Sequence, residues 1–200
     1  MSKTTVASTG IDLSDTFAFT GTVSGIPQGM VRLGGANATG QDVGDISFDL
    51  FTTDYDFYYV TYAISYASSS QFRMQLRASG SYITASNYFM VTQGRRTDGS
   101  GMDYSPNSGG GGTYFAIGDP SEPSNSHLSH SGHFLFHKPM VSSKTTQFDC
   151  SCVFQDTSAN FITRQGGGVY LATGSHSGFG FLGSANLDEY NIQVFGVSQS

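Results

Sequence analysis

Four of the five histidines in the chain lie within the stretch HLSHSGHFLFHKP, at positions His127, His130, His133 and His137. Imidazole nitrogens are common ligands of zinc and nickel, so a metal-dependent hydrolase using the first three is one reading of this cluster. If GHFLFH forms a strand, His133 and His137 project from one face, too far apart to bind one ion without a ligand from another segment. The spacing matches no closed metal site, and we therefore interpret the stretch as the polar face of a strand.

A second candidate for chemistry is the pair of carboxylates Asp54 and Asp56 in TTDYDFYY. Two carboxylates two residues apart on a strand share a face, and could bind calcium or act as an acid and base pair. A calcium loop needs more oxygen ligands and a glycine to turn the backbone, whereas this stretch continues directly into aromatic residues. We predict an ordinary turn at the start of a strand, and another turn at Asp119 and Glu122 in DPSEPSNS.

The two cysteines, Cys150 and Cys152, lie in QFDCSCVFQD, where hydrophobic and polar residues alternate. In a strand they share one face with Phe148 and Phe154, and side chains at i and i+2 are too far apart for a relaxed disulfide. We predict buried thiols. The sequence also lacks a G-x-S-x-G nucleophile elbow, and its glycine-rich segment lacks the Lys and Ser or Thr of a phosphate-binding loop. We therefore expect neither an enzyme nor a cofactor.

Alternation of hydrophobic and polar residues is the repeated signal along the chain, and it predicts the elements that carry these residues. In QFRMQLRA, the clearest half-buried strand, Phe72, Met74 and Leu76 alternate with polar side chains. Further strands are predicted at DTFAFTG, ISFDLF, DFYYVTYAI, SNYFMVTQ, TYFAIG, GHFLFH, QFDCSCVF, VYLATG, GFGFL and YNIQVFGV. About ten strands, separated by short turns, and no convincing helical period predict an all-β protein with negligible helix, either an antiparallel β-sandwich or a β-barrel. Residues 97–112, rich in Gly and Ser, are expected to form a long surface loop.

The segment TTDYDFYYVTYAISY contains six aromatic residues and no glycine or proline. Both faces of the predicted strand are apolar or aromatic, with Tyr55 and Tyr59 on one face and Tyr58 and Tyr62 on the other. One face is expected to meet the opposite sheet, so the other meets an overlying loop, a neighbouring subunit or a ligand. Together with Tyr66, these tyrosines are our candidate face for a subunit interface or a ligand.

Composition narrows the class of protein further. The 200 residues fit a single domain, which we divide into a flexible N-terminal arm at residues 1–12 and one β-sandwich over residues 13–200. The net charge is −6 with only nine Lys and Arg, which argues against nucleic acid as a partner. The chain has no apolar run of membrane-spanning length, and its N-terminus lacks the apolar region of a secretory signal. We therefore expect no membrane partner, and assembly in a cytoplasm.

The order of these features resembles a family of tailed-bacteriophage virion proteins built on a jelly-roll β-sandwich. The resemblance rests on the segments YDFYYVTYAI, FRMQLRASG, SYITASNYFM, GHFLFHKP, SKTTQFDCSCVF and FGFLGSANLDEYNIQVFGV. The last of these ends in an aromatic-Gly-aliphatic triplet, Phe195, Gly196 and Val197. The resemblance covers residues 45–198 and lies in the order and spacing of the segments.

This resemblance implies a structural protein of a virion rather than a catalyst. Members of the family decorate or cement capsids, or form modules of head and tail fibres, usually as homotrimers. We expect a capsid decoration protein, because the sandwich follows a short arm rich in Ser and Thr rather than a long fibre shaft. Its partners would be the major capsid protein and further copies of itself. The alternative is a receptor- or carbohydrate-binding module of a phage tail or fibre, with a host surface glycan as its partner.

Overall fold

The computed structural model describes residues 29–68, 70–99, 102–118, 130–155 and 160–197, and over these residues the chain forms strands and no helix. The eleven strands are β1 (Met30–Phe48), β2 (Phe57–Tyr66), β3 (Arg73–Ala78), β4 (Ser81–Tyr82), β5 (Tyr88–Arg96), β6 (Met102–Gly112), β7 (Phe115–Ala116), β8 (His130–His137), β9 (Thr146–Gln155), β10 (Phe161–Tyr170) and β11 (Gly178–Val197).

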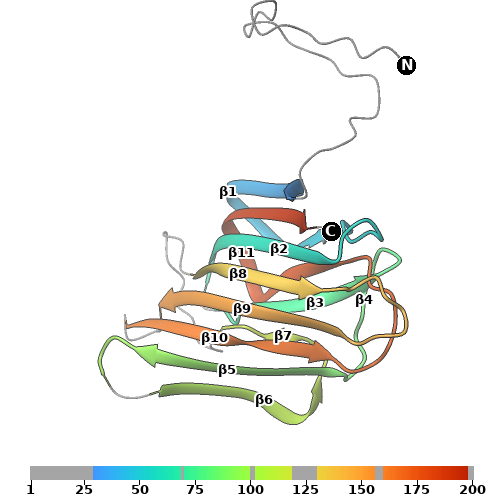
Figure 1. The fold of residues 1–200 in the computed structure, drawn as a ribbon. Helices are drawn as coiled ribbons and strands as arrows, with labels where there is room; N and C mark the ends of the chain where they lie inside the picture. The colour runs from blue at the N-terminus through green and yellow to red at the C-terminus, as the bar shows by residue number, and fades with distance from the viewer. Residues whose placement is uncertain (1–28, 69, 100–101, 119–129, 156–159, 198–200) are drawn as a thin grey trace, which may run out of the picture.

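These strands form one antiparallel sheet in the order β4-β3-β11-β2-β8-β9-β10-β5-β6, with β1 beside β11 and β7 beside β3. The sheet curls at β11, because the beginning of this strand pairs with β3 and its end pairs with β2. In Figure 1 the strands from β11 through β2, β8, β9, β10 and β5 to β6 form a broad front layer, with β3 and β7 behind it. The predicted all-β antiparallel fold is confirmed, and the curled sheet has the form of a β-sandwich or half-barrel. Its jelly-roll type stays a prediction from the resemblance.

An aromatic core fills the space between the two layers. Phe134 of β8 lies with its ring centroid 5.1 Å from Tyr62, 5.6 Å from Phe148 and 5.7 Å from Phe181. Phe181 lies at the beginning of β11, where this strand pairs with β3 of the back layer, so its contact with Phe134 joins the two layers. A contact of 4.6 Å between Phe115 of β7 and Phe148 of β9 does the same. Aromatic pairs contribute about 0.5–1.5 kcal/mol each beyond the burial of their surface. Ring packing therefore holds the two layers together.

The predicted alternation is confirmed in the strands with the clearest patterns. On β9, Cys150 and Cys152 are 5% and 3% exposed and face the core, as predicted. On β3, Met74 is fully buried. Gln75 departs from the pattern, because its side chain is also buried and its Nε2 donates a hydrogen bond to the carbonyl oxygen of Thr113 at 2.6 Å. Thr113 lies two residues before the short strand β7, which pairs with β3 at Arg73 and Met74.

The prediction of a long loop at residues 97–112 is wrong, because most of this segment is β6. Its partner is β5, with Arg95 opposite Met102 and Gln93 opposite Tyr104. The backbone N–H and C=O groups along one side of β5 need hydrogen-bond partners, and β6 provides them. A strand at the end of a sheet can do this through its backbone alone, so its sequence need not alternate between hydrophobic and polar residues. Hydrophobic periodicity therefore gave no signal for β6.

Several predictions lie outside the described residues. These are the flexible arm at residues 1–12, the strand DTFAFTG and the turn at DPSEPSNS. Other strands are longer than predicted, and the two predicted strands GFGFL and YNIQVFGV are parts of the single strand β11. β1 begins at Met30 although only ISF of its sequence alternates, and β10 begins at Phe161 rather than at Val169.

Candidate functional site

The five candidate tyrosines do not form one face. Tyr58, Tyr62 and Tyr66 lie on the core side of β2, each with 4% or less of its surface exposed. The half-buried ring of Tyr55 packs edge-on against Tyr58 at 6.0 Å, at the margin of the core. Of the five, Tyr59 alone lies on the outer face of β2. The interface prediction is therefore corrected to Tyr59, because the other four side chains pack within the chain's own core or against it.

The turn before β2 explains why Tyr55 departs from the predicted alternation. Asp54 hydrogen-bonds within this turn, and Asp56 lies 3.4 Å from the ammonium group of Lys138. Regular strand geometry begins only at Phe57, so the alternation of β2 does not extend back to Tyr55. The two carboxylates are thus part of an ordinary turn at the start of a strand, as predicted.

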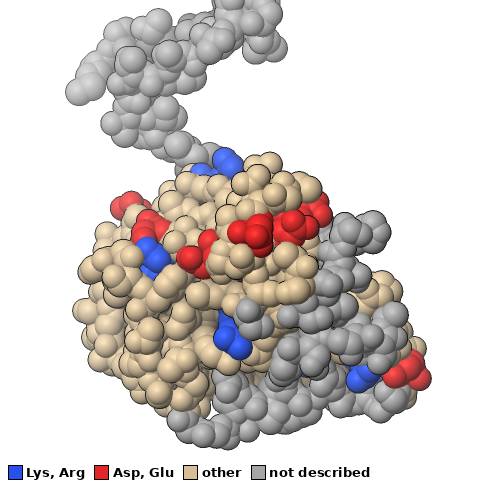
Figure 2. All heavy atoms as spheres, turned by 180° about the vertical axis from the view of Figure 1, so that it is seen from behind, with Lys and Arg blue, Asp and Glu red and all other residues tan. Residues whose placement is uncertain are grey.

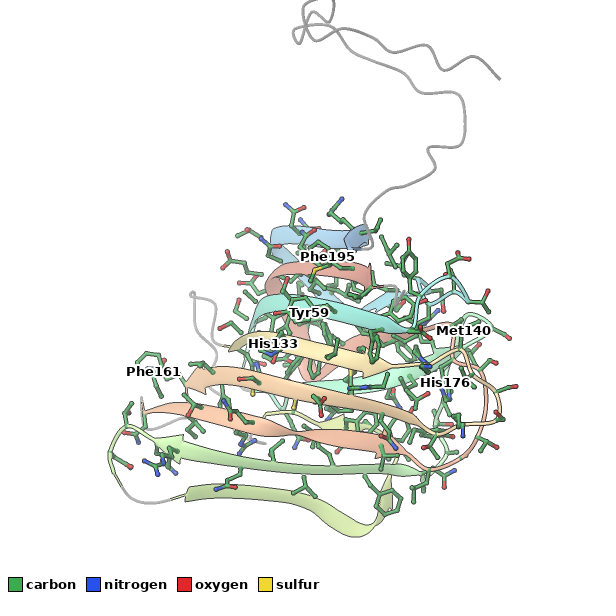
Figure 3. All side chains as sticks on the ribbon, in the orientation of Figure 1. Tyr59, His133, Met140, Phe161, His176 and Phe195 are labelled. Carbon is green, nitrogen blue, oxygen red and sulfur yellow. The ribbon has the colours of Figure 1, made fainter. Side chains whose placement is uncertain are left out.

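Apolar side chains from three neighbouring strands meet on the outer face of the front layer. Phe195 of β11 pairs with Tyr59 of β2, which in turn pairs with Leu135 of β8. In the next outward-facing row, Val197 pairs with Phe57. All five side chains are half-buried, and we call this group the apolar patch. Figure 3 shows Tyr59 and Phe195 on adjacent strands of the front layer.

Two histidines of β8 border the apolar patch. His133 and His137 lie on the same face of the strand, as predicted. Their rings pack on rings of β2, with centroids 5.4 Å apart for His133 and Tyr59 and 5.3 Å apart for His137 and Phe57. His137 Nε2 also lies 2.9 Å from Asp149 Oδ2 of β9. The outer face of β8 therefore combines ring surface with polar groups.

The structure does not bring the proposed metal-binding histidines together. His130 is fully buried on the core side of β8, whereas His133 lies on the opposite side, and His127 lies outside the described residues. Among the described residues, no group of three or more His, Cys, Asp or Glu is placed to hold a metal ion. The hydrolase interpretation therefore loses its geometric basis over this part of the chain.

His130 is instead part of the aromatic core. Its ring lies parallel to that of Phe154 at 5.1 Å and also packs against Phe72 at 4.5 Å. Burial lowers the pKa of His130 well below its ordinary value, and the nearby charge of Arg164 adds to this shift. Arg164 is itself buried, stacks on Phe154 at 4.8 Å and donates to the carbonyl oxygen of Ile117 at 3.2 Å. The neutral imidazole thus serves as a packing group.

Neither cysteine is part of a disulfide, and both side chains are buried, as predicted. Burial raises the pKa of the Cys150 thiol to about 12, and the neighbouring Cys152 and Asp149 raise it further than burial alone. A thiol with this pKa is almost entirely protonated near neutral pH and is a poor nucleophile. These residues therefore fill the core.

A groove that the sequence did not reveal runs over the outer face of β10 and β5. Its first part has a volume of about 540 Å³, and its second part, further along the same two strands, has a volume of about 390 Å³. We call the two parts together the β10–β5 groove. The first part is lined by Phe89, Met90, Val91, His137, Thr145, Gln147, Phe148, Asp149, Gly167, Gly168, Val169 and Leu171. The second part is lined by Gln93, Gly94, Arg95, Thr163 and Gln165.

The back of the molecule carries charged side chains of both signs. Figure 2 shows acidic groups in a band across the upper half of this surface, with basic groups scattered. Some charged side chains of the molecule are paired within the chain. The Arg77 guanidinium, hydrogen-bonded to Asp49 at 2.9 Å, lowers the pKa of that carboxyl. Among the described residues that this view shows, no basic surface of the kind that binds a phosphate backbone is present.

No known protein family, no curated protein and no solved structure matches this chain. Within the described residues, no helix is long and apolar enough to cross a bilayer.

Proposed function

We propose that the protein is a structural component of a tailed-bacteriophage particle, a decoration or cement protein on the outside of the major capsid shell. It assembles in the bacterial cytoplasm and associates with itself as a homotrimer. The phage assignment rests on the sequence resemblance described above. The structural observation that supports a role in association is the apolar patch of Phe57, Tyr59, Leu135, Phe195 and Val197.

The apolar patch has the properties of an association surface. Its side chains project from adjacent paired strands, so their positions are fixed by the backbone of the sheet. Aromatic side chains are enriched in interface cores because they bury a large area with few rotatable bonds. His133 and His137 at the border of the patch add ring nitrogens that can form hydrogen bonds. A second copy that covers this surface would remove half-exposed ring edges from water.

The mechanism of such a protein is mechanical. Many copies bind across the seams between capsid subunits, and each copy adds contact area that must be broken before the shell opens. Because the copies within a trimer bind together, modest contacts with the major capsid protein give stable attachment. No catalytic step is required.

The self-association step is tested by the molar mass of the purified protein in solution, measured by light scattering. We expect wild type to be trimeric, and Tyr59→Ser and Phe195→Ser to shift it towards monomer. Phe161→Ser is the matched control, because Phe161 is 54% exposed at the start of β10, away from the apolar patch (Figure 3). A monomeric wild type would overturn the proposal, and so would a trimer that survives both patch substitutions.

A receptor- or carbohydrate-binding module of a phage tail or fibre is the second candidate function. The observation that favours it is the β10–β5 groove, which lies beside the apolar patch on the same layer. The location of the protein on a particle separates the two candidates, because a receptor-binding module is confined to the tail or its fibres.

A further inference from the structure

The β10–β5 groove is built into the sheet rather than into a loop. At its floor Gly167 faces outward, and a β-carbon there would lie 2.6 Å from the carbonyl oxygen of Phe148. On either side stand Val91 and Asp149, which are the cross-strand partners of Gly167. Binding sites on strands are preorganised, because the backbone of the sheet fixes the positions of their side chains. The groove is therefore preformed.

The pairing of the strands restricts what the groove can bind. β10 pairs with β9 and with β5, and β5 pairs with β10 and with β6. The backbone N–H and C=O groups on both sides of β10 and β5 are thus used within the sheet. An extended peptide that binds by strand addition needs a free sheet edge, and the groove has none. A ligand here must be recognised by side chains.

The side chains offer two kinds of surface along the length of the groove. In the second part, Gln93 and Gln165 are cross-strand partners, as are Thr163 and Arg95, and all four side chains are exposed. Amide and hydroxyl groups both donate and accept hydrogen bonds. They match a ligand that carries many hydroxyl groups.

The first part of the groove is more apolar. Val91 and Leu171 are 55% and 51% exposed, and the half-buried Val169 and Phe89 lie opposite each other between them. Such surfaces pack against the C–H faces of a sugar ring. Val91 and Gln93 lie two residues apart on β5, so apolar and hydrogen-bonding surfaces follow each other along one line. From Leu171 to Thr163 this line spans roughly 26 Å, which accommodates several linked sugar units.

The charge of the groove argues for a neutral ligand. Its second part contains one cation, Arg95, and its first part contains the carboxylate of Asp149, with His137 Nε2 at 2.9 Å. One group of each sign gives no net attraction for a phosphate backbone or a sulfated chain. We propose that the β10–β5 groove binds a neutral, unbranched carbohydrate chain. This inference rests on the second candidate function, the carbohydrate-binding module, and specifies its ligand, whereas the location of the protein on a particle is tested separately.

The test uses the full-length protein on an array of neutral linear glucans, galactans, mannans and N-acetylglucosamine polymers, beside acidic and sulfated chains. Wild type should bind one class of neutral chain. Gln93→Ala and Gln165→Ala each remove amide hydrogen bonds from an exposed position and should weaken binding about tenfold. Asn191→Ala is the control, because it removes an exposed amide on β11, outside the groove. It should bind as wild type does.

Each outcome of the array experiment either supports or overturns the proposed carbohydrate site. Loss of binding in the two glutamine variants, with an unchanged circular dichroism spectrum and binding retained in Asn191→Ala, supports the groove. Binding that survives Gln93→Ala and Gln165→Ala places the glycan elsewhere and overturns the inference. Binding to acidic chains alone contradicts the neutral ligand, and absence of binding across the array rules out the carbohydrate.

Discussion

The buried His130 predicts how the stability of the protein depends on pH. Its imidazole is fully buried against Phe72 and Phe154, and burial, with the nearby charge of Arg164, lowers its pKa well below the ordinary value of 6.5. In the unfolded chain this histidine accepts a proton near its ordinary pKa. The unfolded state therefore binds more protons than the folded state at mildly acidic pH, and the free energy of unfolding must fall as pH falls below 6.5.

The size of this effect follows from proton linkage. While the folded pKa stays lower, each pH unit below the unfolded pKa costs about 1.4 kcal/mol for one group. Between about pH 7.5 and about pH 5.5, His130 should thus remove about 1.4 kcal/mol of stability. In urea this corresponds to a decrease of roughly 0.5 M in the unfolding midpoint. The range stops above the ordinary pKa of the carboxylates, so that Asp49 does not contribute.

The comparison between wild type and His130→Phe isolates this contribution. Phenylalanine preserves a stacked ring between Phe72 and Phe154 and cannot be protonated. His176, which is also buried and has its pKa lowered by burial, contributes equally to both proteins. We expect the free energy of unfolding, measured in urea, to fall between the higher and the lower pH in both proteins. The decrease should be smaller by about 1.4 kcal/mol in His130→Phe than in wild type. Equal losses in the two proteins would refute a neutral, buried His130.

Two further predictions concern the core. In Gly168→Ala the new methyl group would lie 2.5 Å from the Phe148 ring and 2.9 Å from Phe115, so urea unfolding should show a loss of about 1–3 kcal/mol. Gly174→Ala, with no atom within 4 Å of its β-carbon, should stay within about 0.5 kcal/mol of wild type, and similar losses at both sites would contradict this packing. Cys150 and Cys152 should resist a thiol reagent such as DTNB in the native protein and react fully in denaturant, and rapid labelling of native protein would disprove their burial.

The sequence predicts those parts of the fold in which one face of a strand is buried and the other is wet. The alternation around Met74, Phe134 and Cys150 gave the correct faces because each side chain's burial follows from its position in the strand. The signal fails for β6, whose place at the end of the sheet depends on backbone hydrogen bonds. It also fails in β10, because Gly167 and Gly168 have no side chains that could show an alternating pattern. This strand is determined by its pairing with the neighbouring strands β9 and β5.

The candidate site was only partly predictable for the same reason. Alternation identified a strand with two apolar faces, and Tyr59 and Phe57 do lie on its outer face. It could not tell which face of β2 meets the core, and it could not show that Tyr55 lies in a turn. Phe195 joins Tyr59 through the pairing of β11 with β2, which links residues far apart in the chain. The β10–β5 groove depends on the same kind of long-range pairing, so only the three-dimensional structure reveals it.

The most direct test of the proposed function is the location of the protein on purified virus particles, determined by gold labelling with a specific antibody and electron microscopy. A capsid decoration protein predicts label spread over the whole icosahedral shell. Label confined to one vertex would contradict the decoration role and place the protein on the tail, and particles without label would contradict a virion protein altogether.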